Sequence, residues 1–146
     1  MLNLAADRLY TDAPHSVFCQ HTINVGPATV CSWHTDSENL APGICGIGVL
    51  GNFDHCLAGH VLLREARVIL EVAPGDRYYL PSALITHRNS RLREGETCYS
   101  FVLYSPASVF RHYFYKLNPT EASKKKCPKE GRKQWMAGVS LFPTFF

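Results

Sequence analysis

The chain lacks the two sequence features that direct proteins into or across membranes. It contains no apolar run of about 18 residues, the length that a helix needs to span a bilayer. Its first residues, MLNLAADR, hold only a short apolar stretch, and the basic residue follows that stretch instead of preceding it. A secretory signal has the opposite order and a longer apolar segment, so we expect an intracellular protein without a membrane partner.

Cysteine pairs at metal-binding or redox spacing are also missing. The six cysteines are spaced irregularly, and no two of them are separated by two residues. An even number would permit disulfides in a secreted protein, but without a signal peptide we interpret them as reduced and mostly buried thiols. The spacing gives no support to a zinc site with four ligands. The six are Cys19, Cys31, Cys45, Cys56, Cys98 and Cys127.

What the chain does contain is enough apolar material for one folded domain. It has 146 residues, of which 46% are hydrophobic, and this excludes a disordered chain. The net charge is +3, and residues 124–133 (KKKCPKEGRK) carry much of the excess. Such a run is usually a solvated tail, and the functional alternative is contact with the phosphate backbone of nucleic acid.

Short runs of β-branched, aromatic and aliphatic residues, separated by turn residues, begin near residue 28. Proline and glycine at 74–76 and glycine at 95 fall where tight connections between strands need them. Seven short strands predict an all-β sandwich or barrel, and not an alternation of strands and helices. The expected strands are 28–33, 44–50, 60–63, 67–72, 77–80, 83–87 and 97–104.

The chain divides into three segments on this pattern. Residues 1–27 show little periodicity and form an irregular lead-in. Residues 28–115 form the all-β domain, which ends in a short helix at 106–115 with apolar residues on one stripe. Residues 116–146 are a basic C-terminal segment with an aromatic end.

The most informative motif is His34-Thr35-Asp36 together with the distant His87. Side chains at i and i+2 of a strand point to the same face, and a later strand of a barrel returns beside the first. Two imidazoles and one carboxylate suit Fe(II) and leave three coordination positions open, although Mn, Co or Ni accept the same ligands. The alternative is a surface hydrogen-bonding pair, since the chain has seven histidines.

The sequence around this motif resembles the TET/JBP family of 2-oxoglutarate and Fe(II)-dependent dioxygenases, especially its many-copy fungal branch. The resemblance covers roughly residues 28–115. It implies a double-stranded β-helix (jelly-roll) that holds iron in its mouth and oxidises the 5-methyl group of a pyrimidine base in DNA. Succinate and carbon dioxide are the other products, and the base must leave the stack to reach the metal. The matching stretches are 34–47 (HTDSENLAPGICGI), 50–54 (LGNFD), 59–60 (GH), 74–76 (PGD), 81–89 (PSALITHRN) and 95–101 (GETCYSF).

The resemblance also implies roles for single residues, and each has a purely structural alternative. The expected iron ligands are His34, Asp36 and His87. The expected contacts of 2-oxoglutarate are His60 and Ser100, and those of the flipped base are Asn39 and Tyr104. Structurally, Asn39 is explained equally well as a turn residue and His60 as a strand-edge histidine. Ser100 and Tyr104 alternate with core positions on one expected strand, so packing explains them too.

Cys98 is where the sequence departs from the family. It occupies the position, eleven residues after His87, at which fungal members carry the arginine that pairs with the distal carboxylate of 2-oxoglutarate. A thiol supplies neither the charge nor the fork of donors of a guanidinium. Three arginines follow His87 in the next loop, Arg88, Arg91 and Arg93, and each is either a substitute or a solvated loop charge.

Three hypotheses follow for the function. The first is an active dioxygenase with Fe(II) and 2-oxoglutarate that acts on a methylated base in DNA, which would place the protein in the nucleus. The second is a catalytically silent, shortened or decayed member that keeps only metal or nucleic-acid binding. Cys98 and the 33 residues before His34, fewer than family members usually have, favour it. The third is a cupin-like metal-binding module with a small-molecule substrate.

Overall fold

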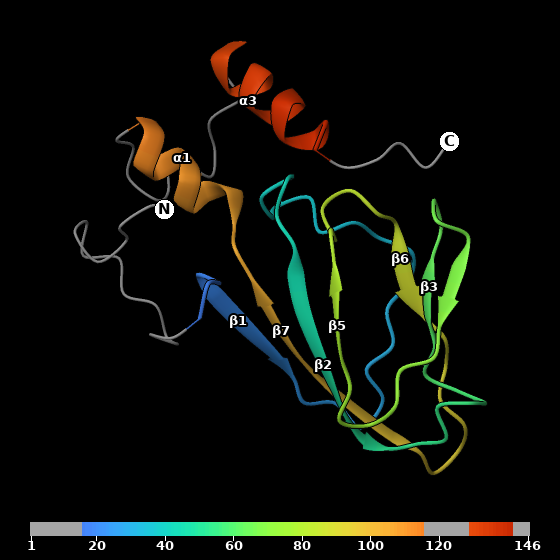
Figure 1. The fold of residues 1–146 in the computed structure, drawn as a ribbon. Coiled ribbons are helices and arrows are strands. Elements are labelled where there is room, and N and C mark those ends of the chain that lie inside the picture. The colour runs from blue at the N-terminus through green and yellow to red at the C-terminus, as the bar shows by residue number, and fades with distance from the viewer. Residues whose placement is uncertain (1–15, 116–128, 142–146) are drawn as a thin grey trace.

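The described strands form two antiparallel β-sheets, and short helices follow them in the chain (Figure 1). The computed structural model describes residues 16–115 and 129–141. The first sheet has the order β1-β7-β2-β5, with β1 at Gln20–Asn24, β7 at Thr97–Tyr104, β2 at Cys45–Asn52 and β5 at Arg77–Leu80. The second has the order β4-β3-β6, with β4 at Val68–Leu70, β3 at Val61–Leu63 and β6 at His87–Asn89. The helices are α1 at Ala107–Tyr115 and α3 at Lys129–Val139.

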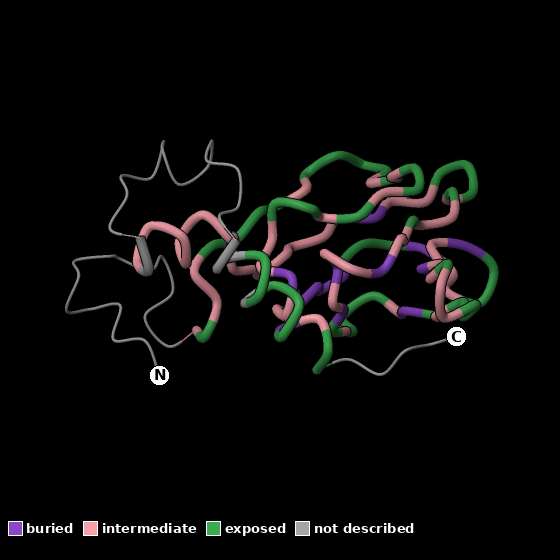
Figure 2. The backbone as a smooth tube through the Cα atoms, turned by 90° about the horizontal axis from the view of Figure 1, so that it is seen from above, coloured by how far each residue is buried: buried purple, intermediate pink, exposed green. Residues whose placement is uncertain are grey.

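The core lies between the two sheets and draws on both. Buried residues gather in the β-sheet part of the molecule, whereas the described part of α1 is only half-buried (Figure 2). Removal of these apolar side chains from water is the main force that holds the sheets together. The buried hydrophobic cluster consists of Cys45, Ile47, Val49, Phe53, Val61, Val72, Leu80, Ile85 and Cys98.

Strand β2 is buried on both faces over its first five residues, and a glycine makes this possible. A Cβ atom at Gly48 would lie 2.0 Å from the ring of Phe101 on the neighbouring strand β7. The missing side chain therefore lets an aromatic ring of one strand lie against the backbone of the next.

Several predicted elements are confirmed. Strands predicted at 44–50, 60–63, 77–80 and 97–104 correspond to β2, β3, β5 and β7, and the helix predicted at 106–115 corresponds to α1. The strand predicted at 67–72 is shorter and forms β4. No described helix is long and apolar enough to cross a membrane. Part of the basic run 124–133 falls outside the described residues, and its last five residues, 129–133, begin α3.

Three predictions about strands were wrong, each for a local reason. Residues 20–24 form β1, inside the expected irregular lead-in, because an exposed edge strand shows no apolar alternation. Residues 28–33 form an extended connection and not a strand. The strand expected at 83–87 begins only at His87, since the backbone N–H groups of Leu84 and Ile85 both donate to Pro81 in a turn.

Candidate metal centre

His34 and His87 are paired through their backbones, although 53 positions separate them in the numbering. The N–H of each donates to the carbonyl of the other, at N to O distances of 3.1 Å from His34 and 2.9 Å from His87. Residues facing one another in such an antiparallel bridge place their side chains on the same side. The two imidazole rings accordingly lie with their centroids 4.3 Å apart.

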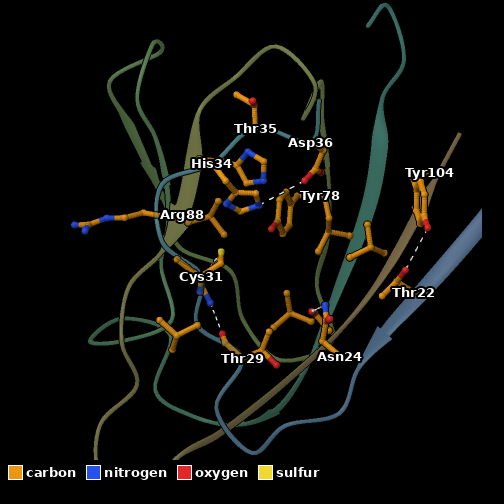
Figure 3. Close-up of a pocket in the computed structure, with 18 of the residues that line it drawn as sticks. Thr22, Asn24, Thr29, Cys31, His34, Thr35, Asp36, Tyr78, Arg88 and Tyr104 are labelled. Atoms are coloured by element: carbon orange, nitrogen blue, oxygen red, sulfur yellow. Dashed lines mark hydrogen bonds and ion pairs between the residues drawn. The ribbon is translucent and has the colours of Figure 1, made fainter. Parts of the chain in front are cut away.

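Asp36 completes the group from the same connection. Its N–H donates to the carbonyl of Ser82 at 2.9 Å, which fixes the backbone beside the turn before β6. Its Oδ1 lies 3.5 Å from Nε2 of His34 (Figure 3). One ligand atom each from His34, Asp36 and His87 lies within 4.8 Å of the other two. The structure therefore brings together the three side chains that the sequence predicts as ligands.

The hydrogen bonds of the two rings fix which nitrogen faces the third ligand. Nδ1 of His34 lies 2.8 Å from the carbonyl oxygen of Ser32, and Nδ1 of His87 lies 2.9 Å from that of Ile85. A carbonyl only accepts, so each Nδ1 carries the hydrogen and each neutral ring keeps Nε2 unprotonated. Backbone carbonyls hold metal-binding histidines in the same way in known metal sites.

This donor set fits a divalent metal ion. With bonds of about 2.1 Å at right angles, two ligand atoms of one ion lie about 3.0 Å apart. The observed 3.5 Å between His34 and Asp36 needs only a small closing movement of two half-exposed side chains. Two neutral nitrogens and a carboxylate oxygen match the preference of Fe(II), and the open side of the group allows further ligands.

A buried polar cluster supports Asp36 from behind. Asn39 Nδ2 lies 3.5 Å from Asp36 Oδ2, 3.2 Å from Cys45 Sγ and 3.3 Å from Ser82 Oγ. Ser82 is 1% exposed, and its hydroxyl is 2.9 Å from the Cys45 sulfur. Burial raises the pKa of the Cys45 thiol, which stays protonated beside the carboxylate. Sequence reasoning missed Ser82 and Cys45, because a serine in a turn and an apolar strand start carry no metal-site signal.

The three ligands stand at the wall of a cavity of about 620 Å³ between the sheets (Figure 3). Four other predicted site residues, Asn39, Cys98, Ser100 and Tyr104, also line it. His60 does not. Its N–H donates to the Ser90 hydroxyl at 3.0 Å and its carbonyl accepts from the Ser90 N–H at 2.8 Å. The sequence prediction that places His60 beside 2-oxoglutarate finds no support in this position.

Strand β1 adds a polar wall that sequence reasoning did not foresee. Asn24 Nδ2 donates to Ser100 Oγ at 2.9 Å, and Thr22 Oγ1 donates to the Tyr104 hydroxyl at 3.4 Å. Both pairs face the cavity across the β1–β7 register (Figure 3). Ser100 and Tyr104 thus line the cavity with part of their hydrogen-bonding capacity already used.

The wall at Cys98 is uncharged. Cys98 is 6% exposed, and burial raises the pKa of its thiol, so the group is neutral at pH 7. Burial also raises the pKa of the nearby cavity residues Cys31 and Tyr78. Apolar side chains of Ile47, Val49, Val61 and Val102 complete this part of the lining.

None of the three arginines after His87 replaces the missing charge, and Arg88 lies on strand β6 and not in the expected loop. Arg88 extends away from the cavity, with its guanidinium 4.8 Å from the ring centroid of Trp33 (Figure 3). Arg91 lines a different, more open pocket. Arg93 binds Glu96, with Nη2 2.8 Å from Oε1, and lies 3.6 Å from Asp54. Of the described residues that line the cavity, Arg88 is the one arginine, and no lysine is among them.

Comparisons with known proteins identify no family for this chain. No protein-family model matches the chain, and none of the curated proteins matches it. Among solved structures, the chain is similar to one from Ralstonia eutropha JMP134 with the provisional name mannose-6-phosphate isomerase. The identity is 18%, the TM-score is 0.39, and the likeness covers 72% of this chain and 97% of that one.

Proposed function

We propose that this protein is a mononuclear non-heme iron oxygenase domain of the double-stranded β-helix type. One observation carries the proposal: ligand atoms of two histidines and one aspartate lie within 4.8 Å of one another at a cavity wall. The two Nδ1 contacts with backbone carbonyls support it, since they leave Nε2 of each ring available to a metal ion. The sequence resemblance to the TET/JBP family agrees with this ligand set.

Some residues of the site would bind the metal ion, and others line the cavity beside it. His34, Asp36 and His87 would hold Fe(II), which supplies a site for activating oxygen next to a C–H bond. The Asn39 amide contacts the Asp36 carboxylate, and Cys45 and Ser82 in turn hold the Asn39 amide. The His34 and Asp36 side chains are 38% and 32% exposed, so a substrate can reach the ligands from the open side of the cavity.

The wall around Cys98 favours an uncharged part of a substrate. The Cys31 and Cys98 thiols and the Tyr78 hydroxyl are neutral, and the Asn24 amide donates to the Ser100 hydroxyl. The charged residues that line the cavity elsewhere are Asp36, Glu38 and Arg88. A planar base with a 5-methyl group meets these requirements and fits a cavity of about 620 Å³. The substrate that we propose is therefore a methylated pyrimidine base of DNA, taken out of the stack into the cavity.

Hydroxylation by oxygen needs two electrons, which 2-oxoglutarate would supply by its oxidative decarboxylation to succinate, but the wall at Cys98 offers this co-substrate no cation. Its distal carboxylate needs a cation with a fork of donors, and Cys98 presents a buried neutral thiol instead. This single observation favours a second candidate, a domain that binds metal and nucleic acid but turns over slowly or not at all with this co-substrate.

Metal binding and turnover are tested separately. Equilibrium dialysis under anaerobic conditions is expected to give one tight Fe(II) at this site, lost in His34→Ala and in Asp36→Ala. His21→Ala, on the exposed strand β1, is the matched histidine control.

To measure turnover, methylated duplex DNA is incubated with the protein, iron and oxygen, with and without 2-oxoglutarate, and the bases are analysed by mass spectrometry. A hydroxymethyl product lost in His34→Ala supports the oxygenase. Iron binding without product supports the second candidate, and Fe(II) binding unaffected by His34→Ala contradicts both.

A further inference from the structure

A second group of metal-ligating side chains lies outside the cavity. His55 and Cys56 belong to the turn after Phe53, and Glu71 follows strand β4. One ligand atom from each of the three lies within 4.8 Å of the other two. None of the three lines the cavity or contributes to the buried cluster behind Asp36. They form a separate surface group that the function proposed above does not use.

The spacing of the two adjacent ligands suits a tetrahedral ion. Nδ1 of His55 lies 3.5 Å from Sγ of Cys56. Zinc bonds of about 2.3 Å to sulfur and about 2.1 Å to nitrogen, at the tetrahedral angle, place these two atoms about 3.6 Å apart. The pair is thus already at the separation that one zinc ion requires, and a carboxylate oxygen of the exposed Glu71 lies within 4.8 Å of the Cys56 sulfur and of a ring nitrogen of His55.

The backbone that carries the ligands is fixed on both sides. Asp54 organises the turn, because its side chain accepts from the Cys56 N–H at 3.1 Å and its carbonyl accepts from Leu57 and Ala58. The Asp54 N–H in turn donates to Glu96 at 3.0 Å. On the other side, the buried Val72 directly follows Glu71. A site on a fixed backbone binds an ion without a large ordering cost.

The sulfur and nitrogen donors of this group determine which metal ion it prefers. A thiolate together with an imidazole nitrogen favours Zn(II) over the oxygen-seeking Mg(II) and Ca(II). Three protein ligands leave one position of a tetrahedral zinc ion for water or for a fourth donor. We infer that His55, Cys56 and Glu71 form a second metal site, of the zinc type, which links the 54–57 turn to the end of β4.

Cobalt is the probe that separates the two sites, since a cobalt–thiolate bond produces an intense charge-transfer absorption. The full chain is titrated with Co(II) alone under reducing conditions. The wild type is expected to bind two equivalents and to show the thiolate band. His34→Ala is expected to lose one equivalent and keep the band. Cys56→Ser is expected to lose the band and keep the other equivalent.

Zinc affinity gives the second readout, measured in the His34→Ala background so that the cavity site does not contribute. Zn(II) is expected to raise the unfolding temperature there. Glu71→Gln is expected to weaken zinc binding by about tenfold or more. The half-exposed Cys19, which contributes to neither site, supplies the control variant Cys19→Ser. A thiolate band that survives Cys56→Ser, or a single equivalent of cobalt in the wild type that His34→Ala abolishes, overturns the inference.

Discussion

Replacing Cys98 with arginine tests whether one side chain controls co-substrate binding in the cavity. Cys98 is 6% exposed and its thiol lines the cavity beside apolar side chains. A guanidinium at this position would reach into a cavity of about 620 Å³, into which none of the described lining residues directs a lysine or arginine head group. It would meet a dicarboxylate with two parallel charge-assisted hydrogen bonds.

The expected gain in 2-oxoglutarate affinity depends on how little water reaches the wall of the cavity at Cys98. A charge-assisted pair in a partly dry pocket contributes about 2–5 kcal/mol, which corresponds to about 30- to 5,000-fold in affinity. Without ligand, the same guanidinium is an unpaired charge in an apolar wall and lowers the free energy of unfolding by about 3–5 kcal/mol. The variant is therefore expected to be less stable alone and to regain stability when 2-oxoglutarate binds.

The assay is anaerobic calorimetry of 2-oxoglutarate binding to the iron-loaded protein. Wild type is expected to bind weakly, and Cys98→Arg more tightly by the factor given above. Cys98→Lys brings the charge without the fork of donors and is expected to gain less. Equal affinity in wild type and Cys98→Arg would refute the reasoning, because it would mean that the dicarboxylate is anchored elsewhere.

Three further predictions concern the support of the site and the fold. Ser82→Ala removes a buried partner of the cluster behind the metal ligands and is expected to lower Fe(II) affinity about 10- to 100-fold by dialysis; unchanged affinity would show that the cluster is not needed. Gly48→Ala places a Cβ atom 2.0 Å from an aromatic ring and is expected to lower the free energy of unfolding in urea by about 1–3 kcal/mol; a loss no larger than that of the unobstructed Gly26→Ala would contradict this. The Arg93 side chain lowers the pKa of Glu96 from 4.5 to about 2, so the stability from this pair is complete above pH 4.5 and disappears as the pH falls toward 2. Glu96→Gln is expected to flatten that part of the acid unfolding curve, and an unchanged slope would rule out the pair as its source.

The sequence predicted which three side chains meet better than it predicted the elements that carry them. The i and i+2 spacing and the distant histidine indicated His34, Asp36 and His87 as one group, and the structure brings these side chains together. The strand expected at 28–33 is instead an extended connection held by isolated bridges. Histidine and aspartate can be recognised as possible ligands from the sequence itself. The backbone pairing that brings them together depends on distant segments, and residue types predict it only weakly.

The surroundings of the ligands were less predictable for a related reason. Ser82 and Asn24 act through hydrogen bonds that form only when distant segments meet, so neither residue is conspicuous in the sequence. Strand β1 was overlooked because four of its five residues are exposed and show no alternation. The lack of an arginine at position 98 was visible from the sequence, and the structure adds that burial raises the pKa of the Cys98 thiol, as apolar surroundings do.

The most direct measurement is the anomalous diffraction of iron in crystals grown anaerobically with Fe(II). One peak is predicted between Nε2 of His34, Nε2 of His87 and the Asp36 carboxylate, at bonding distance from all three. The absence of an iron peak beside these three ligands at saturating Fe(II), whether or not iron binds elsewhere, would contradict the account.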